Sequence, residues 1–344
     1  MRAYQLDDRD GLDRLSLIEQ PDPMPGDKEM LIRMRAGSLN YRDLVLARGS
    51  HGGAAPAGLV PLSDGAGEVV SVGAQVTRFK AGDRVCPTFF PKWYGGDVDR
   101  AKIAAALGGS VDGVLAELVL CGEEAAVAIP DHLSFEEAAT LPCAALTAWV
   151  ALYGPRPIRA GQTVLTLGTG GVSCFAIQFA RAAGATVIST SSSDAKLEAA
   201  RSLGADHLIN YTTNPDWEAE VARLTGGIGV DHVIEVGGGG TMTRSVLSCA
   251  IGGQIHMIGV VSGHGELNPA HLIACKTVRG LMVGSRSDFE AMNRAVAAHR
   301  ITPAIDRVFA FEKAGDAYRH LDSGAHVGKV VISMRSDFSS GGIA

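Results

Sequence analysis

The chain has 344 residues, 46% of them hydrophobic and 20% charged, so it is long enough for two domains with hydrophobic cores of their own. Its formal net charge of -6 argues against nucleic acid or an anionic membrane surface as the main partner, because both require a basic face. No apolar run reaches the length of a membrane span, the N-terminus lacks the apolar core of a signal peptide, and the six cysteines include no C-x-x-C pair. We therefore expect a globular protein of the cytoplasm with reduced thiols.

The first 125 residues contain short β-rich runs interrupted by Gly, Pro and Asp, which predicts a β-rich domain. The expected strands cover residues 30–36, 67–72, 84–88 and 115–120. An aromatic cluster follows the third strand and forms either an apolar wall for a substrate or plain packing of this lobe. Its members are Phe89, Phe90, Trp93 and Tyr94.

From Phe135 onward the pattern becomes α/β. After a helix expected over residues 135–151, six strands alternate with helical stretches, which predicts a parallel sheet. These strands are residues 163–167, 185–190, 207–210, 232–236, 254–259 and 278–283. The last part returns to a helix and short strands, and we expect it to fold back onto the N-terminal domain, with residues 336–344 frayed. Its elements are residues 288–299, 307–311 and 329–333.

The strand at 163–167 runs into a glycine turn, and we expect a helix from Cys174 to Gly184 after it. Gly168 is expected to make the tight turn, and Gly170 to let the backbone approach a pyrophosphate at the helix N-terminus. Ser173 stands where the third glycine of this fingerprint would be, and a small residue suffices there for packing helix against strand. The alternative is a plain turn of an α/β protein. The residues predicted to line the dinucleotide site are Gly168, Thr169, Gly170, Gly171 and Val172.

Several separated motifs resemble the medium-chain dehydrogenase/reductase superfamily in order and spacing over nearly the whole chain. The resemblance implies an α/β fold with a Rossmann NADP-binding domain over residues 126–284. It also implies a GroES-like β-rich catalytic domain over residues 1–125 and 285–344. The motifs are Ala36–Asp43, Asp64–Val69, Gly82–Val85, the glycine turn, Ser202–Asp206 and Gly328–Val331.

The zinc enzymes of this superfamily place a Cys-His pair where this chain has Asn40-Tyr41 and a His-Glu pair where it has Ser63-Asp64, while Cys143 matches the third ligand. One thiolate with Asn and Ser partners cannot hold Zn²⁺. Residues 89–113, which correspond to the lobe of the structural zinc, contain no cysteine. We therefore predict no metal site, and the chain looks similar to the zinc-independent NADPH:quinone oxidoreductase branch that includes ζ-crystallin. Cys143 is then a small buried hydrophobe.

NAD-specific Rossmann folds end the second strand with an acid that binds the ribose 2′-hydroxyl, whereas this chain has hydroxyl side chains there. Similar NADPH-binding proteins have a Lys and a Tyr at the positions of Lys196 and Tyr211. We therefore predict NADP(H) as cofactor, with Ser191, Lys196 and Tyr211 around its 2′-phosphate. Taken singly, the serine is also typical of a polar loop and the lysine of a solvated helix face.

Further cofactor contacts are implied at the carboxyl ends of the later strands and in the C-terminal motif. For Gly237 a simple turn is the alternative. The residues are Gly237, Gly259, Val260, Val261, Val283, Ser285 and Lys329.

Without zinc, hydrogen-bond donors must stabilise the negative charge that hydride transfer develops on a substrate oxygen. This favours acceptors that are already activated, such as quinones and alkenes conjugated to a carbonyl. The candidate catalytic residues are Asn40 and Tyr41, at the metal-ligand positions, and His51, where related enoyl and quinone reductases carry a tyrosine. Tyr41 is alternatively a core residue and His51 a loop histidine. Arg42 and Asp43 are expected to pair and hold the loop.

Three functions remain open. We favour an NADPH-dependent reductase of quinones or enones. The alternatives are a zinc-free alcohol dehydrogenase or carbonyl reductase, and a non-catalytic NADPH-binding protein of the crystallin kind. The expected partners are a small-molecule substrate and a second copy of the chain, paired edge to edge along Val278–Val283, since an exposed apolar edge strand otherwise aggregates.

Overall fold

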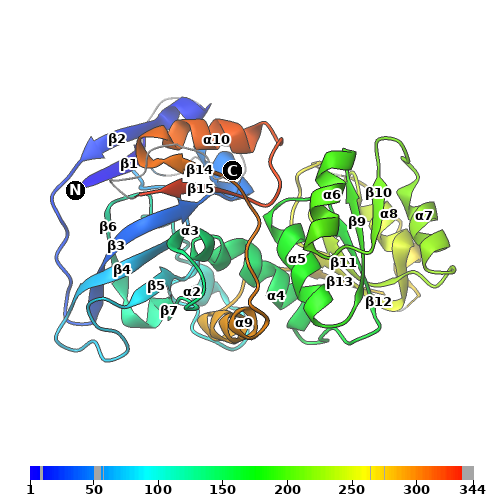
Figure 1. Cartoon of the computed structure of the whole chain (residues 1–344), viewed down its shortest axis with the longest axis horizontal. Helices are drawn as coiled ribbons and strands as arrows, with labels where there is room; N and C mark the ends of the chain where they lie inside the picture. Colours follow the sequence, from blue (N-terminus) through cyan, green and yellow to red (C-terminus); the bar gives the residue numbers. More distant parts are fainter. Residues whose placement is uncertain (8–10, 50–55, 57, 264, 275, 335–344) are drawn as a thin grey trace. The chain divides into compact units, whose positions relative to one another are not determined.

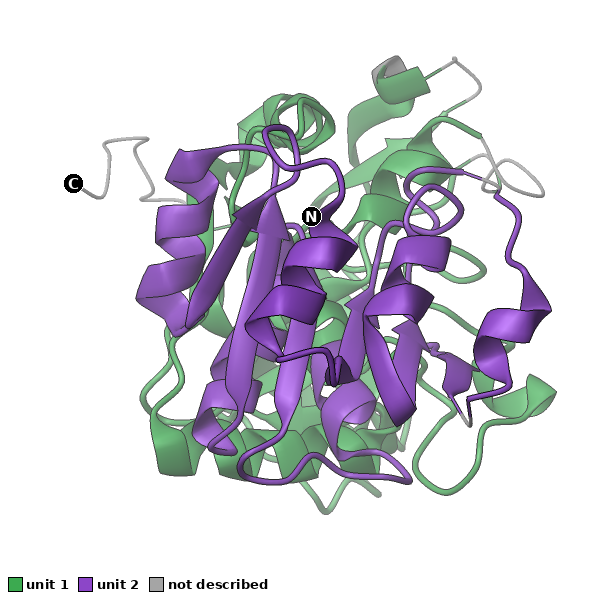
Figure 2. Cartoon of the chain, turned by 90° about the vertical axis from the view of Figure 1, so that its right-hand side faces the viewer, with its two compact units in different colours: residues 1–146, 283–344 green, residues 147–282 purple. Residues whose placement is uncertain are grey.

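The computed structural model describes residues 1–7, 11–49, 56, 58–263, 265–274 and 276–334. The chain forms two compact units (Figure 2): unit 1 comprises residues 1–146 and 283–344, and unit 2 comprises residues 147–282. Among the described residues, no helix is both long enough and apolar enough to cross a membrane.

Unit 1 is built on a mostly antiparallel sheet in the order β14-β15-β3-β4-β5-β7, with β6 also paired to β3 (Figure 1). A separate antiparallel pair joins β1 (Arg2–Leu6) and β2 (Leu15–Glu19). The strands of the sheet are β3 (Glu29–Ser38), β4 (Asp64–Val72), β5 (Arg84–Pro87), β6 (Leu118–Gly122), β7 (Ala126–Ala128), β14 (Ile305–Ala310) and β15 (Lys329–Ser333). The helices and 3-10 turns of the unit are η1 (Gly11–Arg14), α1 (Tyr41–Ala47), α2 (Arg100–Ile103), η2 (Glu123–Ala125), α3 (Phe135–Ala138), α9 (Arg286–His299), η5 (Phe311–Lys313) and α10 (Ala314–Asp322).

The C-terminal part of the described chain returns to the N-terminal sheet, as expected. β15 pairs antiparallel with β3, so that Val331 lies opposite Ser38. The backbone N–H of Leu39 also donates to the carbonyl of Val330 at 3.0 Å. This register brings the first residue of β15 beside the end of β3.

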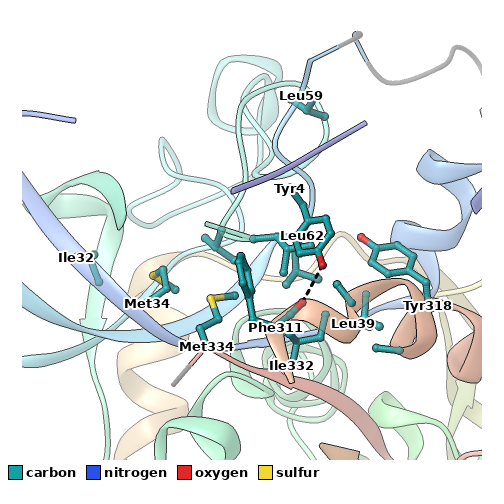
Figure 3. Close-up of a cluster of buried hydrophobic side chains, with 14 of the residues drawn as sticks. Tyr4, Ile32, Met34, Leu39, Leu59, Leu62, Phe311, Tyr318, Ile332 and Met334 are labelled. Atoms are coloured by element: carbon teal, nitrogen blue, oxygen red, sulfur yellow. Dashed lines mark hydrogen bonds between the residues drawn. The ribbon is translucent and has the colours of Figure 1, made fainter. Parts of the chain in front are cut away.

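The core of unit 1 follows from the two-residue period of its strands. Met30, Ile32 and Met34 alternate with more exposed neighbours along β3 and are at most 1% exposed. All three belong to one cluster of buried side chains, and Figure 3 shows Ile32 and Met34 there with side chains from both ends of the chain. There the hydroxyl of Tyr4 donates to the carbonyl of Phe311 at 3.0 Å, and the two rings meet edge to face. The core therefore joins the first strand to the C-terminal segment.

Within the described residues, unit 2 contains a six-stranded sheet in the order β10-β9-β8-β11-β12-β13, and each pair of neighbours is parallel. This confirms the predicted parallel sheet. α5 packs on α6, and α7 on α8, and Figure 1 shows the two pairs on opposite sides of the strands. The strands are β8 (Thr163–Leu167), β9 (Thr186–Ser191), β10 (His207–Asn210), β11 (Val230–Glu235), β12 (Cys249–Met257) and β13 (Thr277–Gly280). The helices are α4 (Leu146–Tyr153), whose first residue belongs to unit 1, α5 (Gly171–Ala182), α6 (Asp194–Leu203), α7 (Trp217–Leu224), α8 (Met242–Ser248) and the 3-10 turn η4 (Pro269–Leu272).

Several expected elements have shifted bounds, and two of these differences have a clear physical cause. The helix expected over residues 135–151 is three pieces: α3, the π-helical turn η3 (Leu141–Ala145) and α4 (Leu146–Tyr153). Pro142 explains the interruption, because proline has no N–H for the helical ladder and its ring crowds the preceding turn.

The second difference concerns the last strand of the parallel sheet. The strand expected at Val278–Val283 covers Thr277–Gly280 instead. Val283 has a φ of +54°, which lies outside strand geometry and is an outlier for a β-branched residue. β13 is an edge of the sheet, and dimerisation along it stays a prediction.

Candidate functional site

Five polar residues from four distant segments meet within unit 1. Asn40 precedes α1, Ser63 and Asp64 stand at the start of β4, Cys143 lies in η3, and Lys329 is the first residue of β15. We refer to these five residues as the Asn40 cluster.

A chain of hydrogen bonds runs from Lys329 through Asn40 and Ser63 to Asp64, and each residue donates to the next. The ammonium of Lys329 donates to the carbonyl of Leu39 and to Oδ1 of Asn40, both at 2.5 Å. Nδ2 of Asn40 donates to Oγ of Ser63 over a long 3.4 Å. The Ser63 hydroxyl then donates to Oδ1 of Asp64 at 2.7 Å.

The charged members of the cluster are buried. Asp64 is 0% exposed and Lys329 is 3% exposed. Burial raises the pKa of Asp64, while the nearby Lys329 charge and the hydrogen bonds from Asn40 and Ser63 oppose the rise. Oδ2 of Asp64 also accepts the backbone N–H of Cys143 at 3.0 Å. Burial raises the pKa of the Cys143 thiol, and the Asp64 carboxylate raises it further, so this thiol stays protonated at neutral pH.

Asp43 holds the loop that carries Asn40. Its Oδ2 accepts the backbone N–H of Asn40 at 2.7 Å at the start of α1, and Asp43 is only 2% exposed. Burial raises its pKa to about 6, against the opposing charge of Arg42. The expected direct pairing of Arg42 with Asp43 is replaced by other contacts. Arg42 donates to the carbonyl of Leu107 at 2.8 Å and stacks on Phe89, 4.5 Å from the ring centre.

The turn into Ser63 is strained. Leu62 is fully buried and has a φ of +78°. A non-glycine residue in that region costs roughly 1–3 kcal/mol and persists only where the surrounding packing enforces it. Gly108 and Gly113 pack closely against this residue, since a Cβ built on either would approach the Leu62 backbone to 2.6 and 2.1 Å. The strain therefore lies next to the Asn40 cluster.

The glycine turn in unit 2 has the geometry of an anion site. Gly168 has a φ of +68°, and Gly170 is the N-cap of α5 without a side-chain cap. The helix starts at Gly171, three residues earlier than the expected Cys174, so Gly171 and Val172 form its first turn. Backbone N–H groups at such a terminus lack helical partners and favour a phosphate. The hydroxyl of Ser173 donates to the carbonyl of Leu167 at 2.7 Å and so ties helix to strand.

Ser191 and Tyr211, two of the predicted 2′-phosphate residues, meet at the ends of β9 and β10. The N–H of Tyr211 donates to the carbonyl of Ser191 at 3.0 Å, and Lys196 is in the first turn of α6. Ser191 is 2% exposed and Tyr211 43% exposed. The nearby carboxylate of Asp194 accepts a hydrogen bond from Asn210 at 2.8 Å.

Glu235 is a residue that sequence reasoning missed. It ends β11, is fully buried, and accepts the N–H groups of Gly237 and Gly238 at 2.7 and 2.9 Å. The hydroxyls of Thr241 and Ser245 donate to it as well. An acid two positions before a run of four glycines was the available signal.

This carboxylate shapes the loop where further cofactor contacts were predicted. Gly259 touches the same loop, since a Cβ there would lie 2.3 Å from the carbonyl of Val236. Val260 and Val261 follow it and are half exposed. The structure therefore brings together Gly237, Gly259 and Val260, as predicted contacts of one ligand require.

The other predicted residues of the described chain belong to unit 1. Val283 and Ser285 belong to unit 1, where Ser285 caps α9 through the N–H of Asp288. Tyr41 is 45% exposed, which contradicts the alternative of a core position. His51 lies outside the described residues. In the aromatic cluster Phe89, Phe90 and Trp93 are buried, and Tyr94 is 46% exposed.

Comparisons with known proteins match both units. The family described as "Alcohol dehydrogenase GroES-like domain" matches residues 26–131, and the one described as "Zinc-binding dehydrogenase" matches residues 171–298. The zinc-type alcohol dehydrogenase-like protein C1773.06c of Schizosaccharomyces pombe is 43% identical over 97% of this chain and 99% of its own length.

Solved structures agree with this match. A candidate alcohol dehydrogenase from Sinorhizobium meliloti 1021 has a TM-score of 0.90 at 42% identity, over 97% of this chain and 99% of that one. An NAD-dependent alcohol dehydrogenase has a TM-score of 0.89 at 35% identity, over 97% and 100%.

Two more distant structures, each 26% identical to this chain, are named for other reactions. One is a quinone oxidoreductase of Pseudomonas syringae pv. Tomato DC3000, with a TM-score of 0.81 over 97% of this chain and 99% of that one. The other is the 2-octenoyl-CoA carboxylase reductase CinF in complex with NADP and 2-octenoyl-CoA, with a TM-score of 0.85 over 98% and 88%.

The residues of the Asn40 cluster do not fit the zinc ion that some of these names imply. A catalytic zinc site needs about three nitrogen, sulfur or carboxylate ligands. Here the Lys329 ammonium binds the Asn40 amide oxygen, the Ser63 hydroxyl donates to Asp64, and the Cys143 thiol resists ionisation. Throughout the part of the chain that the structure describes, no group of three His, Cys, Asp or Glu residues is placed to hold a metal.

Asp43→Asn tests the burial of the carboxyl behind Asn40. Between about pH 4 and pH 6 the unfolded state ionises Asp43 while the folded state keeps its proton, so wild-type stability falls as pH rises. A shift from 3.8 to about 6 corresponds to a change of up to roughly 3 kcal/mol over this range. The variant lacks this term, so urea unfolding at pH 4, 5, 6 and 7 should show it gaining stability relative to wild type as pH rises. Exposed Asp131→Asn is the control, and a pH-independent difference for Asp43→Asn would contradict the raised pKa.

Proposed function

Because this chain belongs to the medium-chain dehydrogenase/reductase family, we propose that it transfers hydride from NADPH to a quinone or an α,β-unsaturated carbonyl without a catalytic zinc ion. The observation that carries the proposal is the hydrogen-bonded Asn40 cluster, in which Lys329 and Asp64 are tied to neutral donors and acceptors. Such a site offers hydrogen-bond donors to a substrate oxygen in place of a Lewis acid.

Hydrogen-bond donors stabilise a developing oxyanion less than a divalent cation does, which limits the substrates. A quinone or an enone delocalises the added electron pair, so it needs less help from the protein than an isolated ketone. Asn40 is the donor we assign to the substrate oxygen. Tyr41 is exposed at the start of α1 and is the second candidate.

The glycine turn supports a dinucleotide as cofactor. Gly168, Thr169, Gly170, Gly171 and Val172 would hold the pyrophosphate against the first turn of α5. Bound NADPH supplies the hydride. Glu235 keeps the Gly237–Gly240 loop in one conformation, and Gly259 lets the next strand end approach it closely.

Selection of NADPH over NADH rests on the end of β9. No acidic side chain stands at Ser191 to repel a 2′-phosphate, and Lys196 and Tyr211 lie on the adjoining segments. Asp194 is bonded to Asn210, which holds this carboxylate in place.

A zinc-free alcohol dehydrogenase or carbonyl reductase is the second candidate, because the S. pombe relative is named as alcohol dehydrogenase-like and the NAD-dependent structural neighbour as an alcohol dehydrogenase. The two candidates differ in their acceptors. An isolated aldehyde or ketone requires strong stabilisation of an alkoxide, whereas an enone or quinone does not.

An acceptor screen tests the proposal. Oxidation of NADPH and NADH is followed at 340 nm with quinones, enones, aldehydes and ketones, and the reverse reaction with alcohols. We expect turnover with quinones or enones and little with aldehydes. Turnover confined to aldehydes or alcohols would establish the second candidate, and tight NADPH binding without turnover would favour a non-catalytic protein.

Metal content is a separate prediction. The purified protein should contain far less than one zinc per chain, and chelators should leave its activity intact, because Asn40 and Ser63 are poor zinc ligands. Elemental analysis measures this directly. About one zinc per chain, lost together with activity, would refute the zinc-free reading of the site.

Lys196→Ala tests the choice of cofactor. A charge-assisted bond to a phosphate is worth roughly 1.5–3 kcal/mol, so the dissociation constant for NADPH should rise by about 10- to 100-fold. That for NADH should barely change, which makes NADH the internal control in a fluorescence titration. Equal losses for both cofactors would show that Lys196 does not contact a 2′-phosphate.

A further inference from the structure

We propose that Lys329 is a positioning residue, whose buried ammonium orients and polarises the Asn40 amide so that Asn40 can donate to the substrate oxygen. This inference rests on the proposed function, because it assigns a role within the same reaction. It differs from the expectation that Lys329 contacts the cofactor.

The orientation of the Asn40 amide follows from the chemistry of its neighbour. A lysine ammonium has three donors and no acceptor, so the amide atom 2.5 Å from Nζ must be the oxygen Oδ1. The nitrogen Nδ2 is thereby turned away from Lys329. Nδ2 faces Ser63 at 3.4 Å and the Asp64 carboxylate beside it, and our proposal assigns one of its two hydrogens to the substrate oxygen.

The position of the ammonium is itself determined by the fold. Its second bond, to the carbonyl of Leu39, is also 2.5 Å long, and Lys329 is only 3% exposed. Pairing of β15 with β3 fixes the backbone positions of Lys329 and Leu39. The charge therefore cannot swing away from Asn40 as a surface lysine would.

Burial of this cation is balanced by carboxylates rather than by solvent. Asp64 and Asp43 both feel its positive charge, and both are at most 2% exposed. In such surroundings an ionic hydrogen bond to Oδ1 draws electron density from the amide and strengthens Nδ2–H as a donor.

The effect on the reaction is specific. Hydride from NADPH would add to the electron-poor carbon of the acceptor, and the displaced electron pair would move to the conjugated oxygen; the resulting anion would then take a proton from water. Nδ2–H of Asn40 stabilises that negative oxygen, and Lys329 acts only through Asn40. Lys329 is therefore expected to change the barrier of hydride transfer rather than the affinity for NADPH.

The experiment is a double-mutant cycle of Lys329→Met and Asn40→Ala, with an enone or quinone from the acceptor screen. Lys276→Met is the matched control, because Lys276 also donates to a backbone carbonyl at 2.5 Å but lies in unit 2. For each protein kcat, KM and the NADPH dissociation constant are measured. The deuterium isotope effect with NADPH labelled at the transferred position is added, because it does not depend on the fraction of folded enzyme.

We expect Lys329→Met to lower kcat by about 10- to 100-fold in the wild-type background and by less than about threefold in the Asn40→Ala background. The isotope effect should rise in Lys329→Met as hydride transfer becomes more rate-limiting, and NADPH affinity should stay within about twofold. Lys276→Met should match wild type in all of these measurements.

Other outcomes overturn the inference. Equal losses in both backgrounds would show that Lys329 acts without Asn40. A lower kcat with an unchanged isotope effect would mean that Lys329 only supports folding. Weakened NADPH binding would indicate that Lys329 contacts the cofactor instead. If wild-type enzyme reduces the acceptor and Lys329→Met does so equally well, this inference fails alone. If wild-type enzyme reduces no acceptor at all, the proposed function fails with it.

Discussion

The antiparallel pairing of β15 with β3 is the interaction on which the rest of unit 1 depends. It attaches a strand from the last part of the described chain to the third strand of the N-terminal part, with Val331 opposite Ser38. A one-residue slip would turn every side chain of β15 to the other face. The same register closes the hydrophobic core around Phe311 and places Lys329 next to Asn40.

The Asn40 cluster shows how a buried polar site is kept stable. Removing charges from water is unfavourable unless each finds partners, and here the ammonium of Lys329 and the carboxylate of Asp64 are each bonded at least twice. The unfavourable φ of Leu62 is retained beside them, held by close backbone packing from Gly108 and Gly113. Strain of this kind is common at functional sites.

Unit 2 also stabilises a buried carboxylate with hydrogen bonds, and two of the donors there are backbone N–H groups just after a strand end. Its parallel strands end at one edge, and backbone N–H groups there need acceptors. Glu235 supplies one acceptor group for four donors, so the glycine-rich loop after β11 holds a defined shape despite its intrinsic flexibility. At the first strand the corresponding N–H groups of α5 are left for a ligand.

Much of unit 2 was determined by the sequence alone. Runs of β-branched residues separated by helical stretches specify parallel strands locally. The turn at residue 168 has a positive φ, which favours glycine, so Gly168 marks this turn in the sequence. Local patterns were less informative where a breaker lay inside a helix, as at Pro142, or where a strand ended in a strained residue, as at Val283. The candidate site residue Asn40 was also identified from sequence, through the motif that contains it.

Only the tertiary structure decided what surrounds Asn40. Lys329 is 289 positions away from Asn40. The motif around Lys329 predicts a strand, but it does not specify which other strand pairs with it. Its contact with the amide exists because long-range strand pairing brings the two backbones together. The same holds for Asp64 and Cys143, 79 positions apart, whose hydrogen bond depends on packing η3 against the start of β4. Periodicity and motifs report local preference, whereas the partners of a buried charge depend on which distant segments share the interior.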